Sequence, residues 1–113
     1  MGGMPTADNP PQTRLTVTVW DRPDAEPRTF ELTEDPPAGT HPRPEAAVAA
    51  IEAAPRPFEP VPRGAMCTQI YGGPQRAVIE GVWRGRRVHA SYDKKNGCEI
   101  ARWKALGAVL DPE

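Results

Sequence analysis

Two cysteines and two histidines carry the side chains best suited to redox or metal chemistry. Cys67 and Cys98 are the only cysteines in a 113-residue chain with 15 prolines, and such a pair favours one disulfide formed in an oxidising compartment. Two alternatives stay open: two unrelated thiols in the cytosol, or a Cys2His2 zinc site completed by His41 and His89. Zinc ligands normally come in pairs roughly two to five residues apart. These four residues are scattered along the chain, so we expect no metal.

No arrangement typical of an enzyme is found in the sequence. It has no glycine-rich phosphate loop, no Ser-His-Asp pattern and no pair of carboxylates in an apolar context. His41, between Thr40 and Pro42, is expected to be a hydrogen-bonded structural residue, because the sequence places no nucleophile beside it. We therefore predict a protein that is not an enzyme and needs no cofactor.

Charge and hydropathy argue against two classes of partner. Lysine and arginine total 14 and aspartate and glutamate total 15, a net charge of −1, so neither nucleic acid nor an anionic membrane surface is an expected partner. No apolar stretch approaches the ~20 residues needed to cross a bilayer. Residues 1–12 lack a basic start and an apolar run, so this stretch is not predicted to be a secretory signal.

The length is that of a single domain, since ordinary domains have about 100–200 residues. The hydrophobic content of 38% is lean for a globular core, so a covalent staple would add useful stability. We predict a flexible N-terminal arm over residues 1–13 and one folded domain over residues 14–113.

Short patterned segments, separated by proline and glycine, predict an α+β fold. Apolar and polar residues alternate in four segments, which form two antiparallel hairpins. Alanine-rich and i, i+3, i+6 patterns predict two helices. A short apolar pair near the C-terminus is compatible with one more strand. The predicted strands are 15–20, 28–33, 76–83, 87–92 and 109–110, and the predicted helices are 46–54 and 99–106.

The segment Ala65–Tyr71 stands apart from these elements. A Pro-x-Pro rhythm precedes it and Gly72-Gly73-Pro74 closes it, so it is separated from the predicted sheet. It has no helical pattern. Two interpretations stay open: an exposed extended segment that a partner binds, or a buried strand with Gln69 on its solvated side.

Four groups of residues, in register from Leu15 to Leu110, resemble the Streptomyces subtilisin inhibitor family of small secreted serine protease inhibitors. One is similar to the family's loop before its helix, one to the start of its protease-binding loop, one to its hairpin and one to its Asn-x-Cys-Glu turn. These groups are Gly39-Thr40-His41-Pro42, Met66-Cys67, Gly81 to Val88, and Asn96-Gly97-Cys98-Glu99.

The resemblance implies a fold, a partner and a site. The fold is a five-stranded antiparallel sheet with two helices packed on one face, and the protein is a secreted, extracellular homodimer formed through the sheet. The function is substrate-like, standard-mechanism inhibition of a subtilisin-type serine protease, with Gln69-Ile70 as the reactive bond. The implied protease-binding loop contains Ala65, Met66, Cys67, Thr68, Tyr71 and Gly72 as well, with the Cys67–Cys98 disulfide and Asn96 as its support.

The chain departs from the family pattern at four positions and in two lengths: the loop before the helix is one residue shorter, and Gly72-Gly73 after Tyr71 includes one extra residue. Glu34 and Val48 occupy the positions of a second family disulfide, and Thr68 stands where proline is common. Gln69 is neither the large apolar residue that subtilisin prefers nor the Lys or Arg that trypsin requires. The alternative function is therefore a diverged binding or structural module without inhibitory activity, including one in which Gln69 is an amide donor for protein cross-linking.

Overall fold

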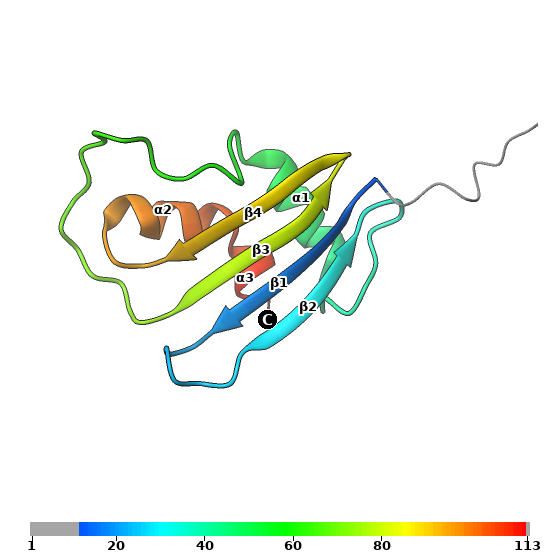
Figure 1. Cartoon of the computed structure of the whole chain (residues 1–113), viewed down its shortest axis with the longest axis horizontal. Helices are drawn as coiled ribbons and strands as arrows, with labels where there is room; N and C mark the ends of the chain where they lie inside the picture. The colour runs from blue at the N-terminus through cyan, green and yellow to red at the C-terminus, as the bar shows by residue number, and fades with distance from the viewer. Residues whose placement is uncertain (1–11, 113) are drawn as a thin grey trace, which may run out of the picture.

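Four antiparallel strands form one sheet in the order β2-β1-β3-β4. The computed structural model describes residues 12–112. Three helices lie on one face of the sheet, and the long segment between α1 and β3 passes around α2 (Figure 1). The elements are β1 Arg14–Trp20, β2 Arg28–Thr33, α1 Pro44–Ala53, β3 Arg76–Trp83, β4 Arg86–Asp93, α2 Gly97–Ala105 and α3 Gly107–Leu110.

The core lies between the sheet and the helices. In β1 the alternate residues Leu15, Val17 and Val19 are at most 1% exposed, because successive side chains of a strand point to opposite faces. The neighbouring strands add apolar residues to the same face. Apolar residues of the helices close over it: Val48 and Ile51 of α1, Trp103 of α2, Leu106, and Val109 and Leu110 of α3.

The hairpin predicted around Arg84-Gly85 is present, with Trp83 paired to Arg86. Arg84 has φ 50° and Gly85 has φ 84°, the conformation of a two-residue turn in which both central residues have positive φ. This turn brings the Arg84 side chain toward the loop that follows β2.

Two expectations about the elements are wrong in the described residues. The sheet has four strands rather than five, and Val109-Leu110 forms part of the short helix α3 instead of a strand. The N–H groups of Val109 and Leu110 both donate to the Leu106 carbonyl at 2.9 Å. This turn buries both side chains at 0% exposure, which an edge strand would not.

None of the helices among residues 12–112 has the length and apolar character that a membrane crossing requires.

His41 is a buried structural residue, as its neighbours in the sequence indicate. It is 3% exposed. Its Nε2 lies 3.0 Å from the Val109 carbonyl oxygen, and its Nδ1 accepts the Arg43 N–H at 3.0 Å. A carbonyl oxygen only accepts, so the proton is on Nε2. His41 thereby joins the loop before α1 to α3.

The predicted flexible arm falls mostly on residues 1–11, which lie outside the described residues, so that expectation stays a prediction. The last two residues of the predicted arm, Gln12 and Thr13, are described, and they contact the β3–β4 turn. The Gln12 carbonyl accepts the Gly85 N–H at 2.8 Å, and the Thr13 hydroxyl accepts the Arg84 N–H at 2.9 Å. Thr13 is 2% exposed.

Glu34 and Val48, the two positions at which the resemblance implies a second disulfide, make other interactions here. Val48 is buried in the core. Glu34 accepts the Arg84 Nε–H at 2.8 Å and the Thr13 hydroxyl at 2.7 Å, and Arg84 also pairs with Glu52 of α1. An ionic cluster therefore connects the end of β2 to the helix. The hydrogen bond from Arg84 lowers the pKa of Glu34 below 4.5, partial burial opposes this effect, and Thr13 adds to it.

We predict that Glu34→Gln lowers the free energy of unfolding by about 1 kcal/mol at pH 7, because a charge-assisted hydrogen bond becomes a neutral one. A carboxyl group whose folded pKa is depressed stabilises the fold above its unfolded pKa. The difference from wild type should therefore shrink as the pH falls from 4.5 through the lowered pKa of Glu34. Urea unfolding across this pH range measures it.

The exposed Glu26→Gln variant is the control, and it should match wild type at every pH. A Glu34→Gln deficit that stays constant at every pH below 4.5 at which the protein folds would contradict this account, since protonation removes the charge that the variant lacks.

Candidate functional site

The segment from Ala65 to Tyr71 is an exposed loop. Of the two interpretations that the sequence left open, the exposed segment is therefore correct and the buried strand is not. Residues 65–73 belong to no helix or strand. Met66, Ile70 and Tyr71 are 96%, 57% and 69% exposed, and they are the large hydrophobic residues that the described part of the chain leaves exposed. Exposed apolar residues gathered in one segment mark a surface that binds a partner.

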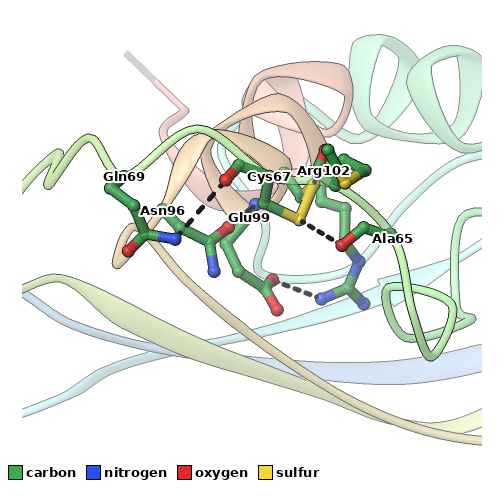
Figure 2. The surroundings of a disulfide bond; sticks show 8 residues. Ala65, Cys67, Gln69, Asn96, Glu99 and Arg102 are labelled. Atoms are coloured by element: carbon green, nitrogen blue, oxygen red, sulfur yellow. Dashed lines mark hydrogen bonds and ion pairs between the residues drawn. A yellow bond between two sulfur atoms is a disulfide. The ribbon is translucent and has the colours of Figure 1, made fainter.

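A disulfide joins this loop to the start of α2. Cys67 and Cys98 are bonded, with their Cα atoms 5.2 Å apart (Figure 2). Their oxidation excludes both the free thiols and the zinc site as alternatives, since a thiolate is the metal ligand. Among residues 12–112, no group of three or more His, Cys, Asp and Glu side chains is arranged to hold a metal ion.

Two backbone hydrogen bonds hold the loop on either side of the expected reactive bond. The Gly97 N–H donates to the Thr68 carbonyl at 2.9 Å, and the Gly72 N–H donates to the Lys94 carbonyl at 2.7 Å. The residues between these two anchors are Gln69, Ile70 and Tyr71, and all three are exposed. Lys94 directly follows β4 and Gly97 is the first residue of α2, so both anchors lie where the chain passes from β4 into α2.

The Gln69 side chain points back toward the Cys67 carbonyl (Figure 2). Its Nε2 is 3.5 Å from the Cys67 carbonyl oxygen, which is at the limit of a hydrogen bond. The side chain is exposed and makes no closer polar contact within the described residues. It is therefore free to enter a binding pocket of a partner.

Asn96 contributes to the site as a helix cap. Its side-chain oxygen accepts the Glu99 N–H at 3.0 Å, an N-cap interaction that fixes the first turn of α2. Glu99 in turn pairs with Arg102 at 2.8 Å, and Arg102 donates to the Ser91 carbonyl of β4 at 3.0 Å. The start of α2, which carries Gly97 and Cys98, is thereby tied to the sheet.

The connector before the loop is fixed as well. Tyr92 of β4 is buried, and its hydroxyl donates to the Pro57 carbonyl at 2.6 Å. Burial raises the pKa of Tyr92 well above its ordinary value, so the hydroxyl keeps its proton and remains a donor. This bond secures the chain eight residues before Ala65, where prolines limit its backbone.

Sequence reasoning missed Gly97 and Lys94 as functional residues. Both act through backbone groups, which every residue type carries, so their identity announces no role. The available signal was the Asn96-Gly97 turn directly before Cys98. Gly97 directly precedes Cys98, which is bonded to Cys67 of the loop, so Gly97 is placed to contact the loop as well.

We predict that the double variant Cys67→Ser/Cys98→Ser loses about 3–4 kcal/mol of unfolding free energy, because the bridge closes 31 residues and restricts the unfolded chain. The loop should also be cut faster by a nonspecific protease. Urea unfolding and limited proteolysis measure the two effects. Ala65→Ser, which adds a hydroxyl and keeps the bridge, should behave as wild type. Equal stabilities for all three proteins would show that the bridge contributes nothing.

Comparisons with known proteins agree with this geometry. Residues 9–96 match the family described as subtilisin inhibitor-like. Subtilisin inhibitor-like protein 1 from Streptomyces cacaoi is 36% identical over 75 residues, which are 62% of this chain and 67% of that protein. Protease inhibitor SIL-V5 from Streptomyces luteoverticillatus is 35% identical over 88 residues, 74% of this chain and 79% of that protein.

The solved structures with a similar fold include one that covers most of the chain. It is Streptomyces caespitosus sermetstatin in complex with Bacillus licheniformis subtilisin, with 25% identity and a TM-score of 0.51, covering 85% of this chain and 93% of that chain. These relatives carry the names of inhibitors, and their family is not enzymatic. With its antiparallel sheet, one-sided helices and disulfide-anchored loop, the chain belongs to the subtilisin inhibitor-like family.

Proposed function

We propose that the protein is a substrate-like inhibitor of a subtilisin-type serine protease and that Gln69-Ile70 is its reactive bond. The observation that carries the proposal is the loop itself. It exposes three large apolar side chains and is anchored to the molecule on both sides of that bond. The match to the inhibitor family and the solved complex of a relative with subtilisin add support.

Docking of the loop uses its backbone and one side chain. An extended exposed segment can pair with the enzyme as an added strand. Gln69 then enters the primary pocket, and its carbonyl oxygen faces the oxyanion donors. Because the loop is held before binding, less conformational entropy is lost on docking, and an interface of ordinary size can be tight.

Anchoring on both sides explains how attack by the enzyme leads to inhibition instead of digestion. The serine Oγ forms a bond to the Gln69 carbonyl carbon, the bond to the Ile70 nitrogen breaks, and the leaving amine takes up a proton from the enzyme's histidine. The acyl side is held through Thr68 and the disulfide, and the amine side is held through Gly72. The amine therefore stays close to the acyl carbon, and religation competes with hydrolysis.

The proposed setting is extracellular. The Cys67–Cys98 disulfide persists in an oxidising environment, and a small protease inhibitor meets its target outside the cell. The amide side chain of Gln69 fits neither a strongly apolar nor an acidic pocket well, so its substitution is the direct test of the site.

We predict that Gln69→Lys creates or strengthens inhibition of trypsin, because the long cation reaches the acidic pocket. Gln69→Met and Gln69→Leu should tighten binding to subtilisin by about 1–3 kcal/mol through apolar burial. Gln69→Pro should abolish inhibition, because proline restricts the backbone and removes an N–H donor. Inhibition constants against both enzymes, with melting curves for each variant, measure these changes.

Ala49→Lys on the exposed side of α1 is the control for added charge, and it should leave both inhibition constants unchanged. This site would be rejected if wild type and all four Gln69 variants left both proteases active and had superimposable melting curves. That result would favour the diverged binding module.

We also propose that two copies associate through the outer face of the sheet. The helices cover the opposite face, and the outer face of the central strands carries Thr18 and its partner Val78, which are only partly exposed. A twofold dimer would let this face of one copy cover the same face of the other.

Light scattering should give twice the 12.3 kDa chain mass at micromolar concentration. Val78→Glu should shift the protein to monomer, because it places a charge in the centre of this face. Ala49→Glu, on the exposed side of α1, should leave the mass unchanged. A wild-type mass of one chain at that concentration would refute the dimer.

A further inference from the structure

Gly97 lies where the start of α2 meets the loop, and a side chain at this position would crowd Thr68. A Cβ built on Gly97 would overlap the Thr68 hydroxyl oxygen and would lie 3.2 Å from the Thr68 Cβ and 3.4 Å from its backbone nitrogen. The positive-φ glycines of the described residues do not include Gly97. Its backbone conformation is open to any residue, so the reason for glycine is the close approach of Thr68.

The same residue also makes the hydrogen bond that holds the loop. The Gly97 N–H donates to the Thr68 carbonyl at 2.9 Å. The next residues on each side, Cys67 and Cys98, are joined by the disulfide. Two adjacent residues of the loop are thus fixed by two adjacent residues of α2, and Gln69 follows immediately.

We propose that Gly97 is a positioning residue for the reactive bond: its missing side chain and its N–H together set the position of the Thr68 carbonyl and, through it, of the Gln69 carbonyl. This inference rests on the proposed inhibitory function. The disulfide alone leaves the backbone beyond Cys67 free to rotate. The contact with Gly97 removes that freedom at the residue before the attacked carbonyl.

A side chain at position 97 would act against both contributions. It would push Thr68 outward and lengthen the hydrogen bond between the Gly97 N–H and the Thr68 carbonyl. The acyl and amine groups formed by attack at Gln69 would then separate more easily, so hydrolysis would gain over religation. The protein would change from an inhibitor toward a substrate while its core stayed intact.

The test compares Gly97→Ala with wild type, against subtilisin. The inhibition constant should rise by about 10- to 100-fold, and mass spectrometry should detect faster cleavage of the Gln69-Ile70 bond. Gly107→Ala is the matched control, because Gly107 is also the first residue of a helix and a Cβ there meets nothing within 4 Å. It should inhibit and resist cleavage as wild type does.

A second pair of variants tests the contact itself. Thr68→Ala removes the hydroxyl that the new Cβ would overlap, so Thr68→Ala/Gly97→Ala should inhibit within a few-fold of Thr68→Ala alone. Such non-additivity is the mark of two residues in contact. Full additivity, or a Gly97→Ala variant as potent and as resistant to cleavage as wild type, would overturn the proposal. Melting temperatures identify any loss caused by unfolding, and the double variant then carries the test.

Failure of the proposed function gives a different result. Wild type would then inhibit neither subtilisin nor other serine proteases, and the contact would be judged from the rate at which subtilisin cuts the loop. The positioning role would be supported if subtilisin cut Gly97→Ala faster than wild type and Gly107→Ala. Adding Thr68→Ala to Gly97→Ala should then slow the cleavage again. Equal rates in all variants would overturn it.

Discussion

The attachment of one loop to the start of one helix is the constraint on which the rest of the structure depends. Cys67 is bonded to Cys98, and the carbonyl of Thr68 accepts the N–H of Gly97. A flexible loop of the same composition would lose conformational entropy on binding and would release its ends after cleavage. Held in this way, the loop would present one conformation to a partner.

The attachment works only because α2 is itself immobile relative to the sheet. Trp103 is 2% exposed in the core, and its Nε1–H donates to Asp111 at 2.8 Å. Asn96 caps the first turn, and Arg102 connects the helix to β4. Each of these contacts lies outside the loop, yet each determines where Cys98 and Gly97 stand. The packing of α2 in the hydrophobic core therefore fixes the position of the loop.

The far end of the molecule relies on weaker interactions. There the cluster of Glu34, Arg84 and Glu52 connects the end of β2 to α1, and both Arg84 and Glu52 are about half exposed. Exposed ion pairs contribute little compared with a covalent bridge. This end does not touch the loop, since its contacts are with Thr13 and α1. The single disulfide is at the end where rigidity matters for binding.

The sequence by itself determined the elements whose signal is local. Alternation along Leu15–Trp20 and Arg28–Thr33 predicted the first hairpin, and Arg84-Gly85 marked the second, because side-chain period and turn chemistry are properties of neighbouring residues. With only two cysteines, the partner of Cys67 was also determined once a disulfide was assumed. The spaced motifs predicted the family and the position of the protease-binding loop in the sequence.

Only the tertiary structure decided what depends on packing between distant segments. Val109-Leu110 has an apolar pattern that suits a strand or a helix, and its position over α1 and β1 selected the helix. The contact of Gly97 with Thr68 joins residues 29 positions apart through a backbone group and a missing side chain, neither of which leaves a periodic signal. Such contacts arise when α2 docks on the sheet, and the physical reason is that close approach is set by the packing of whole elements.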